Sequence, residues 1–317
     1  MRLLVTGGSG FIGSNFILMA SARGFGITNV DALKHGSNPE NLAGMEGGAD
    51  YSFVRGDITD AELMSRLVSE ADMVVNFAAE SHVDRSITDA RPFMESNIMG
   101  VFVLLEAARK HDKRLVHIST DEVFGSLESR SASEDDVLNP SSPYSSSKAS
   151  AELLVRSYVT TYGIKARITR CTNNYGPRQS AEKLIPKVIK HAMDGKKIPV
   201  YGTGKNVRDW IHVDDHCSGI LKVMSDGRDG QSYNISTGNE LDNLVIIRKI
   251  LGIMGKPEDL IEFVGDRPGH DFRYSLDSSR MRGMGWRPGT SIDDGLARAV
   301  EWYAGNPAWW KAEDGWN

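Results

Sequence analysis

The sequence has little cysteine and no surplus of positive charge. Its 317 residues include two cysteines, Cys171 and Cys217, which lie far apart and outside any Cys-x-x-Cys pair. This excludes a disulfide framework and a zinc ribbon, and it favours a reducing compartment. The 37 Lys and Arg residues stand against 42 Asp and Glu residues, a net charge of −5. Because binding to nucleic acid phosphates needs a basic surplus, we expect no nucleic acid partner.

Long hydrophobic runs are also missing. The apolar run that begins at Leu3 is too short for the core of a signal peptide, and no stretch approaches the roughly 20 apolar residues that span a membrane. We therefore expect a cytoplasmic protein with no membrane partner. Glycine is plentiful, at 32 residues, and clusters at the ends of apolar runs. Such glycines suit turns and the close approach of a ligand.

Apolar runs of strand length alternate with segments of helical period in the N-terminal half. The expected strands are 3–6, 28–31, 51–55, 73–77, 114–120 and 166–170, and the expected helices are 11–22, 60–71, 92–110 and 143–162. This alternation predicts an α/β fold with a doubly wound parallel sheet, of the Rossmann type, covered by helices on both faces. After about Pro177 the alternation loosens, with helices expected near 182–193, 213–224 and 244–252 and strands near 198–201 and 232–235. This predicts a smaller mixed α/β C-terminal lobe.

A glycine-rich turn follows the first expected strand. It reads Thr6-Gly7-Gly8-Ser9-Gly10-Phe11-Ile12-Gly13 and leads directly into a helix. Such a turn lets the backbone approach a pyrophosphate at the helix N-terminus. Asp31 lies eighteen residues after Gly13, at the end of the second strand, where a carboxylate can accept ribose hydroxyls and repel a 2′-phosphate. The pattern favours NAD over NADP, and glycines that serve packing alone are the alternative.

A second motif is Tyr144-Ser145-Ser146-Ser147-Lys148, which places a phenol and an ammonium four residues apart on one helix face. We expect Lys148 to lower the pKa of Tyr144, so that the phenol can act as a base toward a sugar hydroxyl. Thr120, Asp121 and Glu122 follow the fifth expected strand, where one acid and one base could serve a single elimination. A surface pair and an ordinary turn are the alternative interpretations.

Together these motifs resemble those of the extended short-chain dehydrogenase/reductase family, and in particular its members that dehydrate nucleotide sugars. The resemblance continues through 76–86, 173–177, 209–215 and 267–271, so it spans nearly the whole chain. It implies an NAD-dependent lyase that converts dTDP-glucose, or a related nucleoside-diphosphate hexose, to the 4-keto-6-deoxy sugar. The steps would be oxidation at C4, loss of water across C5 and C6, and hydride return to C6.

Other functions of the same fold remain open. A UDP-sugar 4-epimerase or a UDP-glucuronate decarboxylase would need no second acid and base, and such relatives usually carry small residues in place of Asp121 and Glu122. An NAD-sensing regulatory protein without enzyme activity would not need a complete set of Thr120, Tyr144 and Lys148.

The resemblance assigns a role to each candidate site residue. Tyr144 would take the O4 proton, Thr120 would steady the 4-keto oxygen, Glu122 would remove the C5 proton and Asp121 would protonate the departing C6 hydroxyl, with Lys148 completing the catalytic set. The positions that match the family's NAD contacts are Gly7, Gly10, Phe11, Ile12, Gly13, Asp31, Asp57, Ile58, Ala78, Ala79, Ser96, Tyr144, Lys148 and Asn174. Those that match its substrate contacts are Ser81, His82, Asn173, Lys183, Pro199, Tyr201, Arg208, Asn243, Arg267 and His270.

The resemblance also implies an organisation of the chain. Residues 1–176 would form the NAD-binding Rossmann domain, and residues 177–317 would form mainly a nucleotide-sugar-binding lobe, parts of which return to the sheet. A homodimer would form through a four-helix bundle that uses the helix 97–108 and the helix carrying Tyr144. Because the helix 97–108 is apolar nearly all round, we expect it to be buried on all sides.

Several features point away from further chemistry or depart from the family pattern. His212 and His216 have the spacing of a helical zinc pair but lack the glutamate that follows the first histidine, so we expect no metal. The family's usual tyrosine is replaced by Phe124, and the stretch 32–38 lacks an aromatic residue common there. The tryptophans near the C-terminus predict a docked terminal helix and tail rather than a carbohydrate platform; they are Trp302, Trp309, Trp310 and Trp316.

Overall fold

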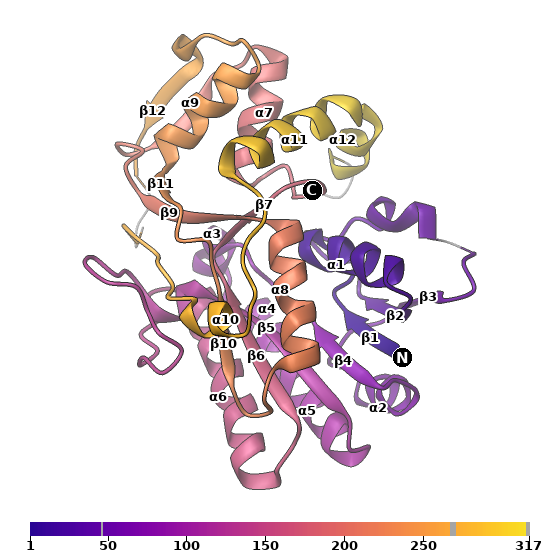
Figure 1. Cartoon of the computed structure of the whole chain (residues 1–317). Coiled ribbons are helices and arrows are strands. Elements are labelled where there is room, and N and C mark those ends of the chain that lie inside the picture. Colours follow the sequence, from indigo (N-terminus) through magenta and orange to yellow (C-terminus); the bar gives the residue numbers. More distant parts are fainter. Residues whose placement is uncertain (46, 267–270, 315–317) are drawn as a thin grey trace.

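A seven-stranded parallel sheet forms the centre of the computed structural model, which describes residues 1–45, 47–266 and 271–314 (Figure 1). The strand order is β10-β6-β5-β4-β1-β2-β3. The bounds are β1 Arg2–Thr6, β2 Gly26–Asp31, β3 Tyr51–Arg55, β4 Met73–Asn76, β5 Arg114–Thr120, β6 Ala166–Cys171 and β10 Ser232–Ile235. The chain proceeds outward from β1 in one direction and from β4 in the other, so the predicted doubly wound sheet is confirmed. Ligands of such sheets bind beyond the carboxyl ends of the strands, where the order reverses.

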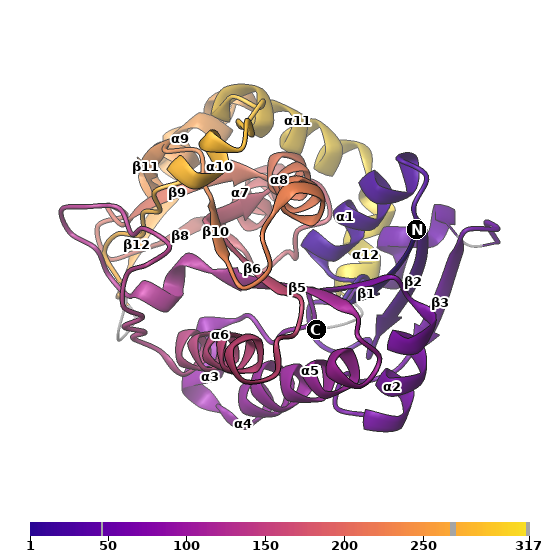
Figure 2. The ribbon, with the colours of Figure 1, turned by 60° about the horizontal axis from the view of Figure 1, so that its bottom comes forward.

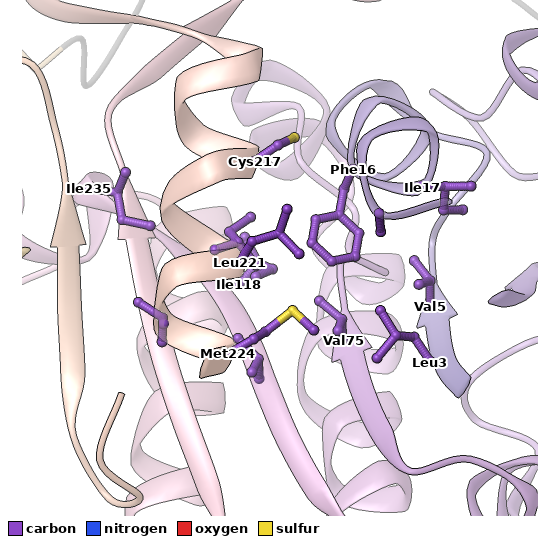
Figure 3. Packing of buried hydrophobic residues seen from close by; sticks show 14 of the residues in the cluster. Leu3, Val5, Phe16, Ile17, Val75, Ile118, Cys217, Leu221, Met224 and Ile235 are labelled. Atoms are coloured by element: carbon purple, nitrogen blue, oxygen red, sulfur yellow. The ribbon is translucent and has the colours of Figure 1, made fainter. Parts of the chain in front are cut away.

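Helices cover both faces of the sheet, as Figure 2 shows. One face carries α1 Phe11–Ala22 and α8 Val213–Asp226, and the other carries α2 Ala61–Glu70, α5 Val101–Lys110 and α6 Pro143–Tyr162. The burial of β4, in which all four residues are buried, reflects this double cover. Phe16 of α1 and Leu221 of α8 pack together over Val75 of the sheet (Figure 3). The turn that connects β1 to α1 is thus held between a buried strand and a buried helix.

A second lobe with its own core lies beside the carboxyl edge of this sheet. Its strands are β7 Asn173–Tyr175, β8 Ile198–Tyr201, β9 Val207–His212, β11 Glu240–Asp242 and β12 Ile261–Val264, and its helices are α7 Leu184–Asp194, α9 Asn243–Ile253, α11 Ile292–Gly305 and α12 Pro307–Asp314. The short elements of the chain are η1 Pro39–Met45, α3 Val83–Thr88, α4 Arg91–Phe93, η2 Met94–Gly100, η3 Asp121–Phe124, η4 Glu258–Leu260 and α10 Ser279–Gly283. The predicted strand at 232–235 is β10, which pairs with β6 in the main sheet.

The expected helix at 92–110 is broken into three parts: α4, the π-helix η2 and α5. Within η2, the Asn97 side chain donates hydrogen bonds to Glu80 O (3.0 Å) and Ser147 Oγ (2.8 Å) and accepts one from Glu80 N (2.9 Å). The wider turn thus coincides with a buried amide that joins α6 to the chain after β4. The expectation of burial on all sides is wrong for the single chain, since Met99 and Phe102 are exposed.

The tryptophans near the C-terminus lie in the core of the second lobe. Trp302 of α11 packs edge-to-face against Trp309 of α12, with ring centroids 5.4 Å apart, and Trp309 contacts Trp310 in the same way at 5.3 Å. The predicted docked terminal helix is therefore confirmed, while Trp316 lies outside the described residues. Within the described part of the chain, no helix is both long and apolar enough to cross a membrane.

Candidate active site

One cavity lies at the carboxyl ends of β1, β2, β4, β5 and β6. Every position expected to contact NAD lines this cavity, and so do Thr120, Asp121 and Glu122. Four of the positions expected to contact substrate also line it: Ser81, His82, Asn173 and Lys183. Residues distant in the sequence are thus brought to the one edge of the sheet where a ligand is expected.

The glycine-rich turn has the close packing and the open space that a dinucleotide requires. Gly7 has φ +69°, and a Cβ there would lie 2.5 Å from Ala78 N. A Cβ on Gly13 would lie 2.4 Å from Gly7 O, so the chain itself excludes side chains at both positions. Gly10 differs, because a Cβ there would meet nothing closer than Gly7 O at 3.4 Å. Since Gly10 lines the cavity, the space beside it suits the close approach of a phosphate group at the start of α1.

Asp31 lies at the end of β2, buried against the glycine-rich turn. Its Oδ2 accepts a hydrogen bond from Ser9 N (2.9 Å), and its Oδ1 accepts from Leu33 N (2.8 Å) and Ser37 Oγ (2.8 Å). Burial raises the pKa of Asp31, although these three donors oppose that effect. The carboxylate therefore ties the turn to the following loop while it lines the cavity.

Thr120, Asp121 and Glu122 form the start of the 3₁₀ turn η3, directly after β5. The Thr120 hydroxyl donates to Asp121 Oδ1 (3.1 Å) and accepts from Glu122 N (3.3 Å), which caps the turn. Asp121 is 5% exposed, and its Oδ2 has no hydrogen-bond partner in the described part of the chain. Burial, reinforced by the neighbouring Glu122, raises the pKa of Asp121 to about 8. At neutral pH Asp121 therefore carries a proton that it can donate.

Tyr144 and Lys148 lie one turn apart near the start of α6. Ser142 caps this helix through a capping box with Ser145, and the Lys148 ammonium donates to Ile118 O (2.7 Å) at the end of β5. Burial lowers the pKa of Lys148 to about 8. Burial and the charge of Glu122 raise the pKa of Tyr144 well above its usual value. The prediction that Lys148 lowers the pKa of Tyr144 is therefore wrong for this structure, because desolvation of the phenol is the larger effect.

Sequence reasoning missed three polar side chains that also line the cavity, those of Lys34, His35 and Glu182. Glu182 Oε2 lies 3.1 Å from His35 Nε2 and 3.4 Å from His82 Nε2, so it joins three separate segments. Lys34 forms an ion pair with Asp57 at 2.6 Å. The signal available in the sequence was the departure from the family pattern at 32–38, which places Lys34 and His35 after β2. Their partners could not be inferred, since Glu182 lies 147 residues from His35.

Other predicted substrate residues lie outside the described lining of this cavity. Arg208 is buried and donates to Val207 O (2.7 Å), Phe272 O (3.0 Å) and Asp271 O (2.9 Å), and its guanidinium stacks over the Tyr274 ring at 4.3 Å. The residues that likewise do not line the cavity are Pro199, Tyr201 and Asn243. Arg267 and His270 lie outside the described residues.

The two histidines with zinc-like spacing have structural roles here. The His212 side chain caps α8 by accepting from Asp214 N (3.3 Å), and His216 is buried with its Nδ1 2.9 Å from Asn174 Oδ1. Burial lowers the pKa of His216 to about 3. Among the described residues, no group of His, Cys, Asp and Glu side chains is arranged to hold a metal ion.

Comparison with known proteins identifies the family to which the chain belongs. A family model described as GDP-mannose 4,6 dehydratase matches residues 4–299. The chain belongs to this dehydratase family. It is a branch of the extended short-chain dehydrogenases/reductases, so the family predicted from the sequence motifs is confirmed.

Known proteins resemble the chain over nearly its full length. The dTDP-glucose 4,6-dehydratase of Mycolicibacterium smegmatis is 48% identical over 98% of this chain and 96% of its own. The dTDP-glucose 4,6-dehydratase DesIV of Streptomyces venezuelae, solved with NAD and TYD bound, has a TM-score of 0.96 and 47% identity, covering 99% of this chain and 100% of DesIV. The UDP-glucose 4-epimerase of Thermotoga maritima, solved with UDP-glucose, has a TM-score of 0.90 at 29% identity, covering 96% and 99%.

Proposed function

We propose that this chain is an NAD-dependent dTDP-glucose 4,6-dehydratase, a lyase that makes the 4-keto-6-deoxy sugar. The observation that carries this function is the acid and base pair, Asp121 and Glu122, in the same cavity as Tyr144 and Lys148. An epimerase needs only the oxidising residues, whereas a dehydratase needs one carboxyl group to give a proton and another to take one. The relatives at 48% and 47% identity are named as this dehydratase, and the epimerase is more distant at 29%.

The residues around the glycine-rich turn fit NAD. Gly10 leaves room for a pyrophosphate at the N-terminus of α1, and the buried Asp31 suits a ribose with free hydroxyls and disfavours a 2′-phosphate. Bound NAD would supply the acceptor for the electrons and hydrogen that leave C4, and its positively charged ring would favour the ionised form of Tyr144. DesIV was crystallised with NAD, which supports the same cofactor here.

The protein residues would handle the protons of three successive steps. Tyr144 takes the O4 proton as C4 is oxidised, and Thr120 holds the new 4-keto oxygen. The ketone makes the C5 proton acidic, and Glu122 removes it. Asp121 donates its proton to the C6 hydroxyl, which leaves as water, so the C5–C6 double bond forms as the C–H and C–O bonds break. After C6 is reduced, a proton returns to C5 and the 4-keto-6-deoxy sugar is complete.

The nucleotide sugar would enter from the side of the second lobe. Ser81, His82, Asn173 and Lys183 line the part of the cavity formed by the β4–α3 connection, β7 and the segment before α7. We assign residues 1–176 to cofactor binding and residues 177–317 mainly to nucleotide-sugar binding, with α8 and β10 contributed to the sheet lobe. The remaining predicted contacts stay part of this proposal: Pro199, Tyr201, Arg208, Asn243, Arg267 and His270.

A second copy of the chain is the partner that fits the exposed apolar side chains of η2, α5 and α6. Met99, Phe102 and Leu153 are all exposed on these three adjoining helical segments. Covering them in a homodimer by a four-helix bundle would remove apolar surface from water. The substitutions Phe102→Glu and Leu153→Glu should then give monomers in sedimentation experiments, while Met193→Glu, at an exposed methionine of α7, should leave a dimer.

The carboxyl pair provides the test of the proposed function. The Asp121→Asn and Glu122→Gln variants should still oxidise C4 of dTDP-glucose, because Tyr144 and Lys148 are unchanged. Water loss should fall by about 10²–10⁴-fold, so reduced cofactor should accumulate on the enzyme and be visible by its absorbance. The control Glu128→Gln alters an exposed carboxyl six residues along the chain and should behave as wild type. Near wild-type dehydration by both variants would contradict the proposal.

A further inference from the structure

The C-terminal helix is connected to the glycine-rich turn by a chain of buried hydrogen bonds. Trp309 Nε1 of α12 donates to Asn41 Oδ1 of η1 (2.8 Å), and Asn41 Nδ2 donates to Ser9 O (3.0 Å). Ser9 N in turn donates to Asp31 Oδ2 (2.9 Å). In both views α12 lies close to the N-terminal segments of the chain (Figures 1 and 2). Two side chains therefore join the last described helix to the turn and to the acid that line the cavity.

The hydrogen bonds to Ser9 O help to hold one peptide group of the turn in place. Ser9 O accepts from Asn38 N (3.0 Å) as well as from Asn41 Nδ2. Because a peptide unit is planar, holding Ser9 O also helps to hold the N–H of Gly10, which donates to Gly7 O (3.3 Å). Gly10 is the glycine of this turn that faces open space in the cavity. Asn41 thus positions the backbone where a bound pyrophosphate would lie.

A second set of contacts, made by Arg178, holds Asn41 and Trp309 in place relative to each other. Arg178 Nε donates to Asn41 O (3.3 Å), and its Nη1 donates to Asn15 Oδ1 (3.2 Å) on α1. The Arg178 guanidinium also lies over the ring of Trp302, 5.6 Å from its centroid, and that ring packs on Trp309. The aromatic core of the second lobe is therefore attached to the start of α1 as well as to η1.

We propose that Trp309 is a positioning residue for the cofactor, acting through Asn41 on the Ser9–Gly10 peptide. This inference rests on the proposed use of NAD. A catalytic cycle that returns its electrons to the sugar needs a cofactor that stays bound, and a rigid turn disfavours release because less ordering is needed on binding. Since Trp309 belongs to the core of the second lobe, the same contact joins that lobe to the cofactor site.

The chain offers a matched pair of substitutions to test this role. Trp309 and Trp310 are both 7% exposed and neighbours in one aromatic cluster, but Trp310 Nε1 donates to Tyr303 O (3.1 Å) rather than to Asn41. Both Trp309→Phe and Trp310→Phe lose one buried indole hydrogen bond, so both should lower the unfolding temperature by similar amounts. Only Trp309→Phe should release NAD faster, roughly tenfold, as expected when one buried hydrogen bond is removed.

The measurement is the rate at which the holoenzyme loses NAD to an excess of competing nucleotide, together with amide hydrogen exchange over residues 7–13. Asn41→Leu should reproduce the faster release, and combining it with Trp309→Phe should add little, because both remove the same link. Equal NAD release by Trp309→Phe and Trp310→Phe would overturn the inference. So would unchanged release by Asn41→Leu, even if Trp309→Phe fails to fold. A wild-type protein that binds no NAD would instead refute the proposed function.

Discussion

Replacing Asp121 by asparagine should change how the stability of the protein depends on pH. The folded pKa of Asp121 is about 8, against an ordinary value of 3.8, because the carboxyl is buried beside Glu122. The folded chain therefore keeps a proton that the unfolded chain releases. The contribution of this proton to stability is complete below about pH 4 and is lost as the pH rises through about 8.

The size of the effect follows from the gap between these two pKa values. A gap of about four pKa units corresponds to roughly 6 kcal/mol of unfolding free energy in total, at roughly 1.4 kcal/mol per unit. Between about pH 5 and about pH 7, the wild-type free energy of unfolding should fall by roughly 3 kcal/mol on account of Asp121 alone. An asparagine does not ionise, so this component should vanish in Asp121→Asn.

The assay is denaturant unfolding of wild type and Asp121→Asn at several pH values in that range. Groups other than Asp121 titrate in both proteins, so the difference between their unfolding free energies isolates the one carboxyl. Asp135→Asn is the control, because the Asp135 side chain is 84% exposed, and this variant should behave as wild type. Parallel pH dependences for wild type and Asp121→Asn would refute the protonated, buried Asp121 on which the acid role depends.

Three further predictions concern the cofactor, the base and the core. Tyr144→Phe should reduce the rate of C4 oxidation by at least about a hundredfold with NAD still bound. The control Tyr162→Phe, at an exposed position of the same helix, should leave that rate unchanged. A rate loss of less than about tenfold in Tyr144→Phe would exclude Tyr144 as the base. Asp31→Asn should narrow the preference for NAD over NADP in enzyme stripped of cofactor, and equal use of both cofactors by wild type would contradict the assignment of Asp31. Glu152→Gln should destabilise the protein by about 3–5 kcal/mol, because it leaves the fully buried Arg170 without its charge partner. Arg170 Nη2 lies 2.6 Å from Glu152 Oε2. An unchanged free energy of unfolding in denaturant would show that this ion pair does not stabilise the fold.

The sheet and its glycine-rich turn could be predicted because their signals are local. The strand expected at 73–77 is β4, Met73–Asn76, a mainly apolar run that lies between α2 and α3 in the chain. The roles of Gly7 and Gly13 follow from the spacing that a strand–turn–helix unit requires. In contrast, the apolar pattern of 92–110 does not predict the π-helix. A π-helix is defined by its backbone hydrogen bonds, and the pattern of apolar residues does not show these bonds.

The features that escaped prediction depend on burial or on contacts between distant residues. The direction of the Tyr144 pKa shift differs from the expected one, because the sequence shows the nearby Lys148 but not how completely the phenol is desolvated. The bond from Trp309 to Asn41 joins residues 268 positions apart, and neither residue belongs to a motif. Such pairs become visible only when the packing of the second lobe against the sheet is known.

The most direct test of the account is the product that the purified protein forms from dTDP-glucose in deuterated water. A 4,6-dehydratase should give a nucleotide sugar lighter by the mass of one water, apart from the added deuterium, with a ketone at C4, a methyl group at C6 and solvent deuterium at C5. Mass spectrometry and NMR would identify this product. A C4 epimer that retains all its oxygen atoms and carries no deuterium at C5 would contradict the account, and would leave Asp121 and Glu122 as residues of an ordinary turn.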